Sequence, residues 1–177
     1  MKKIELLPLT GINIENIGII QFGLDIHNIK LKLGEPNLQN DTELYYDEFR
    51  IDLNENEEIE FIEFQGPTPK DIDISIYDVN PFTICANKLL EILAIKNKGT
   101  IDDSEAPYCY CFMNISVGLW REFVEKDILD TIENMKNVGD YEKSKEWINL
   151  DLEKSKFFWS IGIGRKDYYK LFKSDVQ

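Results

Sequence analysis

Hydrophobic and polar residues alternate along three segments in the first half of the chain, at 45–53, 58–64 and 71–76. Successive side chains of a β-strand point to opposite faces, so a period of two residues predicts a strand with one face toward a core. The turn-forming segment 54–57 separates the first two segments. We therefore predict a β-hairpin there.

Apolar runs predict further strands. The glycine-bounded segment 17–23 indicates the end of a strand and a turn, 108–121 indicates one long strand or two shorter ones, and 157–163 indicates a buried strand. Apolar residues at helical spacing predict helices over four segments: 25–33, 83–96, 125–137 and 141–154. Asp25 and Thr83 are suited to cap the first two helices, and Gly34 and Pro36 are suited to end the first.

These elements predict an α+β fold in which an antiparallel or mixed sheet packs against a few helices. A length of 177 residues, without a linker rich in Pro, Gly or Ser, indicates a single domain over residues 1–177. The order helix, acidic turn, aromatic strand occurs twice, which fits either a duplicated helix-plus-strands unit or a common α+β rhythm. The pattern fits both one mixed sheet and two separate sheets.

Acidic residues are concentrated in one region of the chain. Between Asp41 and Asp78 there are thirteen Asp and Glu residues against Arg50 and Lys70, a net charge of −11 out of −13 for the whole chain. A field concentrated in this way attracts cationic partners and speeds their arrival. The same field repels phosphates, which argues against direct binding of DNA or RNA.

Composition indicates the compartment. Hydrophobic residues make up 43% of the chain, which is enough for a core and too many for a disordered protein. Glu5 and Pro8 interrupt the N-terminal apolar run, unlike a secretion signal, and no stretch reaches the ~18 apolar residues of a membrane helix. We therefore expect a cytoplasmic protein with no membrane partner. Cys85, Cys109 and Cys111 are expected to be reduced, buried thiols.

Few residue patterns suggest chemistry. The single histidine, His27, has no evident nucleophile placed with it, and Cys109 with Cys111 lacks the further ligands of a zinc site. Gly162-x-Gly164 lacks the length of a P-loop and the third glycine of a dinucleotide fingerprint. Gly162 is instead expected to allow a neighbouring backbone or ring to approach closely. We predict no catalytic residue, no cofactor and no metal site.

The carboxylates of the acidic region allow three interpretations. They alternate with apolar residues such as Ile59 and Phe61, as on the solvated face of a half-buried strand. Glu58 and Glu60 with a neighbouring acid could instead hold a hard cation or act as an acid/base pair. Like charges on neighbouring strands lower stability, however, and a protein-binding surface would explain why they are retained.

For the protein-binding interpretation we predict a surface that combines these acids with two aromatic residues. Rings beside charged groups are common at interfaces, and strand parity favours Tyr46 and Tyr77 as exposed anchors. The predicted partner-binding residues are Asp41, Glu43, Tyr46, Glu48, Asp52, Glu55, Glu57, Glu58, Glu60, Glu63, Asp71, Asp73, Tyr77 and Asp78.

The segment Gly18-Ile19-Ile20-Gln21-Phe22-Gly23-Leu24, followed by Leu33-Gly34-Glu35-Pro36, resembles an opening of the form I-x-F-G … L-G-x-P that is common in small bacterial proteins. Among these proteins are cytosolic immunity proteins of polymorphic-toxin and contact-dependent growth inhibition systems. The later segments 59–64, 119–122 and 159–164 are also similar to that group. Such families share no catalytic residues. The resemblance implies a cognate inhibitor that binds a toxin domain and blocks it.

Charge and resemblance lead to the hypothesis of a non-enzymatic immunity protein that neutralises a basic toxin domain. A nuclease toxin is favoured because nucleases hold nucleic acid in cationic clefts. The alternatives are a regulatory or adaptor module for another basic protein, and a metal-dependent enzyme that uses the clustered carboxylates.

Overall fold

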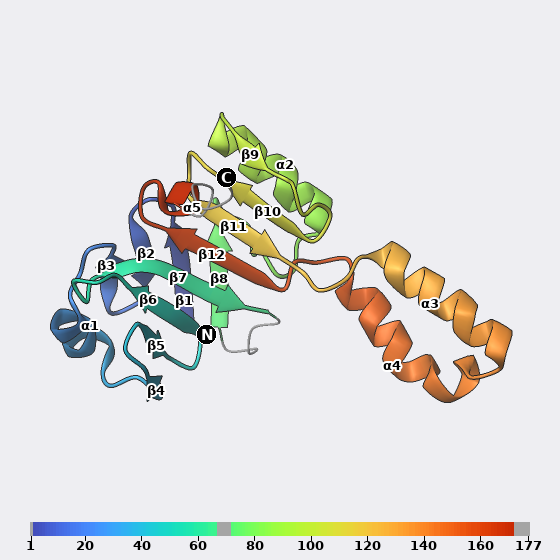
Figure 1. The fold of residues 1–177 in the computed structure, drawn as a ribbon. Coiled ribbons are helices and arrows are strands. Elements are labelled where there is room, and N and C mark those ends of the chain that lie inside the picture. The colour runs from blue at the N-terminus through green and yellow to red at the C-terminus, as the bar shows by residue number, and fades with distance from the viewer. Residues whose placement is uncertain (1, 67–71, 172–177) are drawn as a thin grey trace.

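The computed structural model describes residues 2–66 and 72–171, and it confirms the predicted α+β class (Figure 1). The described residues form two β-sheets and five helices. The helices are α1 (Ile26–Leu33), α2 (Ala86–Asn97), α3 (Glu125–Val138), α4 (Tyr141–Lys154) and α5 (Tyr168–Leu171). The strands are β1 (Lys2–Leu7), β2 (Gly11–Ile14), β3 (Gly18–Gln21), β4 (Leu38–Gln39), β5 (Glu43–Tyr45), β6 (Phe49–Leu53), β7 (Ile59–Gln65), β8 (Ile72–Ile76), β9 (Ile101–Asp102), β10 (Cys109–Phe112), β11 (Val117–Trp120) and β12 (Ser160–Gly164).

The larger sheet contains eight antiparallel strands in the order β4-β5-β6-β7-β12-β11-β10-β9. Each half of it is a four-stranded meander, and the two meanders meet where β7 pairs with β12. Helix α1 precedes the first meander and α2 precedes the second, while α3 and α4 are inserted between β11 and β12. The repeated rhythm of the sequence corresponds to this arrangement of one helix and four strands in each half.

The smaller sheet has four strands in the order β3-β2-β1-β8. Strand β1 pairs antiparallel with β2 and parallel with β8, so this sheet is mixed. In β1 the buried residues Ile4 and Leu6 alternate with the exposed residues Lys3 and Glu5. The sequence pattern predicted β8 and the end of β3, but neither β1 nor β2.

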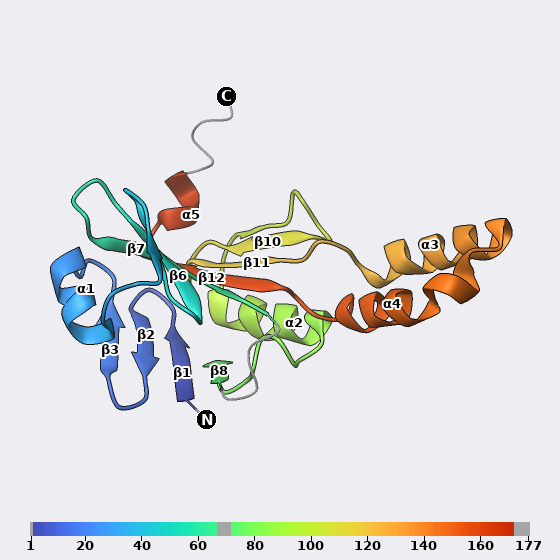
Figure 2. The same cartoon turned by 90° about the horizontal axis from the view of Figure 1, so that it is seen from below.

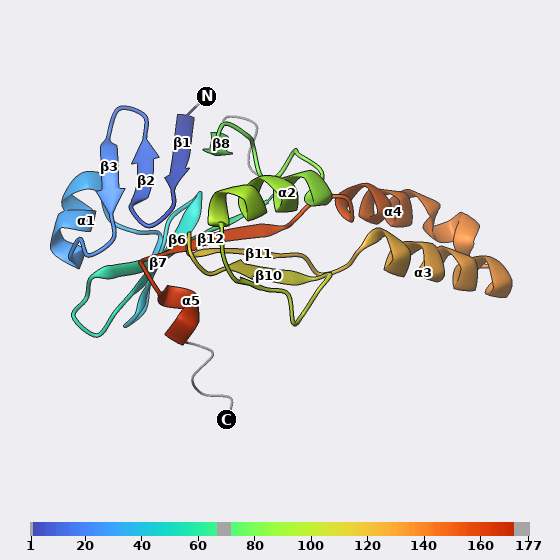
Figure 3. The same cartoon turned by 90° about the horizontal axis from the view of Figure 1, so that it is seen from above.

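The inner face of the eight-stranded sheet is covered by the four-stranded sheet and by helix α2, which lie side by side. Figures 2 and 3 show the four-stranded sheet against the half that contains β6 and β7, and α2 against the half that contains β10 and β11. Buried residues of the two sheets and of α2 form one hydrophobic cluster, to which Ile4, Ile51, Phe64, Leu89 and Val117 belong. On the opposite, outer face the short helix α5 is the only described helix that packs against the strands (Figure 2).

Helices α3 and α4 form a hairpin that projects from the body, which we call the arm (Figure 1). Its own small core consists of the buried residues Ile128, Ile132 and Ile148. Arg121, at the end of β11, holds the root of the arm: its Nε donates to the carbonyl of Pro107 at 2.9 Å and its Nη1 to that of Ser155 at 3.3 Å. Both arm helices were predicted from the sequence.

Three local predictions need adjustment. Helix α2 begins at Ala86 with Cys85 as its N-cap, rather than at Thr83. The segment 45–53, predicted as one strand, contains the end of β5 and the whole of β6, which are separated by residues 46–48. For 108–121, the structure confirms the alternative of two shorter strands, β10 and β11, joined by a turn. Cys85 is exposed, and Cys109 and Cys111 are half-buried, so the prediction that these free thiols are buried is wrong.

Candidate functional site

Strand register brings four charged residues together on the outer face of the eight-stranded sheet. In β6 the buried apolar residues alternate with Arg50 and Asp52, which therefore point away from the core. Arg50 is paired across the ladder with Glu63 on β7, and Asp52 is paired with Glu43 on β5. Glu43, Asp52 and Glu63 thus surround Arg50, and we call these four residues the carboxylate cluster.

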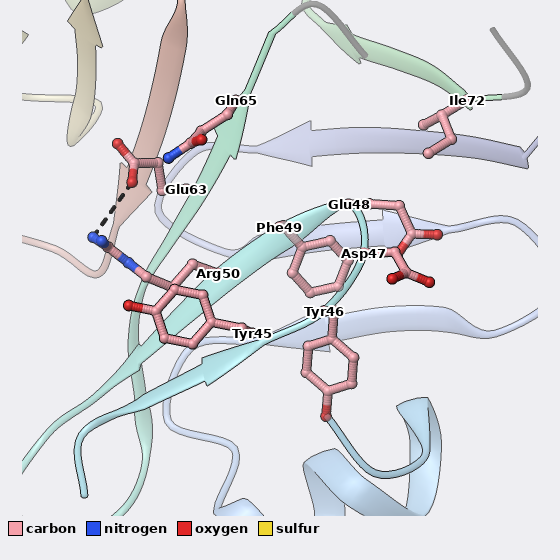
Figure 4. Close-up of a pocket in the computed structure, with 9 residues that line it drawn as sticks. All are labelled: Tyr45, Tyr46, Asp47, Glu48, Phe49, Arg50, Glu63, Gln65 and Ile72. Carbon is pink, nitrogen blue, oxygen red and sulfur yellow. Dashed lines mark ion pairs between the residues drawn. The ribbon is translucent and has the colours of Figure 1, made fainter. Parts of the chain in front are cut away.

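The guanidinium of Arg50 contacts all three carboxylates. Its Nε lies 2.7 Å from Oδ1 of Asp52, its Nη2 lies 3.4 Å from Oε2 of Glu63, and its Nη1 lies 3.7 Å from Oε1 of Glu43. Figure 4 shows Arg50 reaching toward Glu63 from the neighbouring strand. Nη2 of Arg50 also donates a hydrogen bond to Oδ2 of Asp52 at 3.1 Å. The Nε and Oδ1 atoms are closed to solvent and face each other as an ion pair without the alignment of a hydrogen bond. All four side chains are less than one-third exposed.

The cluster keeps an excess of negative charge, because three carboxylates share one guanidinium. Burial, with smaller contributions from Glu43 and Glu63, raises the pKa of Asp52 to about 6 against the lowering effect of Arg50. Burial acts to lower the pKa of Arg50, but the carboxylates of Asp52 and Glu63 outweigh it, so this pKa is raised. A second cation brought to this face would therefore be attracted strongly.

Two depressions adjoin at Glu63 and Gln65. The first, drawn in Figure 4, is lined by Tyr45, Tyr46, Asp47, Glu48, Phe49, Arg50, Glu63, Gln65 and Ile72. The second is lined by Glu63, Gln65, Gly66, Trp120, Trp159 and Ser160. The first depression also reaches Phe49 of the main core and Ile72 of the four-stranded sheet. We call the outer-face part of the two depressions the outer-face groove and define it by Tyr45, Arg50, Glu63, Gln65, Trp120 and Trp159.

The two tryptophans of this groove are not among the residues predicted from the sequence to bind a partner. Trp120 is 45% exposed although it belongs to an apolar strand. Its ring lies 6.1 Å from that of Trp159 in a perpendicular arrangement. A signal was available for Trp120, since Val117 and Leu119 alternate with it and point into the core.

Four of the predicted acids lie at one end of the first meander. Glu55 and Glu57 are exposed in the turn between β6 and β7. Asp41 lines a shallow depression together with Glu57, and Glu58 accepts a hydrogen bond from Nδ2 of Asn54 at 3.2 Å. These acids extend the negative surface beyond the end of β6 that carries the carboxylate cluster.

Two other predicted acids are held by internal ion pairs. Glu48 lies 2.7 Å from Nζ of Lys2, and Glu60 lies 3.3 Å from Nε of Arg165. Each of these cations balances the charge of its partner. Glu48 and Glu60 therefore add less to the negative surface than a count of the acidic residues in the sequence suggests.

The remaining predicted acids are not brought together with the carboxylate cluster. Asp73 and Asp78 lie in and just after β8, which belongs to the four-stranded sheet. Asp71 lies outside the described residues. The acidic region of the sequence is therefore divided between two sheets, and its outer-face part consists of Glu43, Asp52 and Glu63.

The two predicted aromatic anchors are half-buried and not exposed. The hydroxyl of Tyr46 donates to the carbonyl of Gly34 at 3.1 Å, and burial raises the pKa of Tyr46 to about 12. Tyr77 packs against the main core, and Nζ of Lys96 lies 5.0 Å from the centre of its ring. Both rings are committed to contacts within the fold, so the exposed aromatic surface of the outer face comes from other residues.

The other candidates for chemistry are placed as follows. His27 is exposed on α1. The rings of Phe61 and Tyr169 lie directly over Gly162, which confirms the close approach predicted there. Within residues 2–66 and 72–171, no three His, Cys, Asp or Glu side chains are arranged to hold a metal ion.

No family model, curated protein or solved structure matches this chain. None of the helices in the described ranges is both long and apolar enough to span a bilayer.

Proposed function

We propose that this protein is a non-enzymatic bacterial immunity protein that acts in the cytoplasm and neutralises a basic toxin domain. Binding takes place through the carboxylate cluster and the outer-face groove beside it. The observation that carries the proposal is the charge imbalance of the cluster, in which three half-buried carboxylates share one arginine on the outer face of the sheet.

A purely structural role leaves this imbalance unexplained. Acids placed side by side repel one another, and the pKa of Asp52, raised to about 6 mainly by burial, shows that its ionised form is disfavoured there. A lysine or arginine supplied by a partner would restore the balance and would lower that pKa. Interfaces use such complementary charge to select partners and to speed association.

The strands make this surface suitable for tight binding. Glu43, Asp52 and Glu63 are attached to three neighbouring strands whose backbones are fixed by ladder hydrogen bonds. Little ordering is therefore needed when a partner docks. The exposed ring of Trp120 supplies apolar area next to the charges, as is common at the centre of protein interfaces.

The choice of a toxin as partner rests on the resemblance of the segments Gly18–Leu24 and Leu33–Pro36 to immunity proteins. The choice of a nuclease rests on charge, because a cationic nucleic-acid cleft is complementary to this face.

Co-expression with the product of the neighbouring gene tests the proposal. The native protein should protect the host from growth arrest and should copurify with that product. The double variant Glu43→Lys/Glu63→Lys should lose both properties, whereas Glu133→Lys/Glu146→Lys, with the same charge change on exposed positions of the arm, should keep them. If neither the native protein nor the arm variant protects the host, and neither forms a complex with the product of the neighbouring gene, the immunity function is rejected.

A further inference from the structure

The second depression of the outer face is a pit whose walls come from three neighbouring strands. Gln65 of β7, Ser160 of β12 and Trp120 of β11 lie in line across the ladder. The short side chain of Ser160 stands between two long ones, so it forms the floor while Gln65 and Trp120 form opposite walls. Glu63, two residues before Gln65 on the same strand, lines the end of the pit toward the carboxylate cluster.

The aromatic wall of this pit is rigid and partly open to solvent. Trp120 and Trp159 are perpendicular, with an angle of 88° between their ring planes. Trp159 is braced from behind by Phe123, whose ring lies 4.6 Å away, and its Nε1 donates to the carbonyl of Lys154 at 3.4 Å. The exposed 45% of Trp120 is therefore aromatic surface that the fold does not use.

The acidic end of the pit has capacity for another cation. Glu63 forms an ion pair with Arg50 at 3.4 Å, but Arg50 also forms ion pairs with Asp52 at 2.7 Å and Glu43 at 3.7 Å. A carboxylate has lone pairs for more than one donor, and the amide oxygen of Gln65 is a further acceptor.

We propose that this pit is a subsite for one arginine side chain of the basic partner. The guanidinium packs against the indole of Trp120 and hydrogen-bonds to Glu63. The inference rests on the proposed function and specifies the group of the partner that the outer face recognises.

Arginine fits these walls better than lysine. Strands two places apart in a sheet are separated by about 10 Å, which leaves a planar group room between Gln65 and Trp120. A guanidinium is planar, carries five donors and is weakly hydrated, so it can stack on an aromatic ring and bond to a carboxylate at the same time. An ammonium is a compact, strongly hydrated charge without a flat face.

The three tryptophans of the chain provide the readout. We would follow their indole N–H signals by NMR during titration with N-acetyl-Gly-Arg-Gly-amide, and with the peptides in which citrulline or lysine replaces arginine. The arginine peptide should shift the signals of Trp120 and Trp159 in a saturable manner. Trp147, 48% exposed on the arm, should not respond and serves as the internal control. Citrulline has nearly the same shape without the charge and should bind about tenfold more weakly.

A matched pair of variants assigns the carboxylate. Glu63→Gln should weaken binding of the arginine peptide about fivefold or more, whereas Glu146→Gln on the arm should leave it unchanged. Equal affinities for arginine and citrulline, shifts of equal size at Trp147, or silent Trp120 and Trp159 signals would each overturn the subsite. The comparison of peptides on the native protein needs no variant, so a folding defect of Glu63→Gln does not affect it.

Failure of the subsite and failure of the proposed function give different results. If arginine selectivity is absent while Glu43→Lys/Glu63→Lys still abolishes protection, only the subsite is wrong. If protection survives that charge reversal, the proposed interface itself is wrong.

Discussion

Asp52 is a carboxylate whose ionisation is disfavoured by its own position. Its pKa rises from the ordinary 3.8 to about 6, mainly because of burial. Between about pH 4 and pH 6, the native state therefore keeps a proton that the unfolded chain has released. Because the native state binds more protons than the unfolded state in this window, raising the pH favours the unfolded state. The contribution of Asp52 to the unfolding free energy therefore falls as the pH rises from about 4 to about 6.

Replacing the carboxylate by its neutral amide isolates this effect. For Asp52→Asn, the unfolding free energy of the native protein minus that of the variant should fall by about 2 kcal/mol between about pH 4 and pH 7. Urea unfolding at a series of pH values measures the difference. A difference that stays constant, or that rises with pH, would show that Asp52 is not the strained acid described here.

At the scale of elements, Asn97 joins the end of α2 to two turns. It is 2% exposed. Its Nδ2 donates to the carbonyls of Gly99 at 2.9 Å and Thr100 at 3.0 Å, and its Oδ1 accepts from the backbone N–H groups of Asn114 at 2.8 Å and Ile115 at 3.3 Å. One buried side chain therefore forms hydrogen bonds with four backbone groups of residues 99–100 and 114–115.

Removing this side chain should be strongly destabilising. We expect Asn97→Ala to lower the unfolding free energy by about 3 kcal/mol, because four backbone groups lose the hydrogen-bond partner that this buried side chain provides. Asn87→Ala, at an exposed position of the same helix, should change it by less than about 0.5 kcal/mol. Equal effects of the two substitutions in chemical denaturation would contradict the role assigned to Asn97.

Two glycines opposite each other in the ladder give α5 its place on the outer face. Gly118 of β11 is paired with Gly162 of β12, and Tyr169 packs where a side chain at either position would stand. The ring of Tyr168 stacks beside it on Phe61, with 4.7 Å between ring centres. The missing side chains thus create the hollow that the C-terminal helix fills.

A double-mutant cycle tests this packing. Gly118→Ala should destabilise the native protein by about 2 kcal/mol, since the added methyl group overlaps the ring of Tyr169. In a Tyr169→Ala background the same substitution should have little effect. Additive losses would mean that the methyl group clashes with something other than this ring.

Local signals in the sequence were sufficient for the elements they specify. Asp25 caps α1 by accepting from the N–H of Asn28 at 3.0 Å, and Gly34 ends that helix with φ of 84°. Both interactions lie within a few residues, so the chain itself records them. The parallel pairing of β1 with β8 joins segments that are far apart in the sequence, so no local residue pattern predicts it.

The same limit explains which part of the candidate site was predictable. Alternation placed Arg50 and Asp52 on one face of their strand, but it could not show that Glu43 and Glu63 lie beside them or that Asp73 belongs to a different sheet. The pit around Trp120 depends on the pairing of β11 with β12, which are separated by the whole arm. No local pattern could have revealed it.

At the scale of the whole molecule, a well-filled body carries a thinly packed arm. The main hydrophobic cluster spans both sheets and α2, whereas the arm buries only Ile128, Ile132 and Ile148 of its own among the described residues. Elements with few buried apolar contacts open more readily than the core.

Hydrogen exchange should therefore separate the two parts. Backbone amides of α3 and α4 should exchange at least about a hundredfold faster than those of β7, β11 and β12, as followed by mass spectrometry of peptic fragments. Uniform protection across these elements would show instead that the arm unfolds together with the body.

The central claim is that the outer-face carboxylates bind a basic protein, and the affinity of that complex tests it most directly. Calorimetry would compare the native protein with Glu43→Lys/Glu63→Lys and with the arm control Glu133→Lys/Glu146→Lys at about 50 and about 300 mM salt. The account predicts that the outer-face pair weakens binding by about a hundredfold or more, that the arm pair has little effect, and that salt weakens the native complex. Equal affinities for the native protein and the outer-face variant would contradict the account.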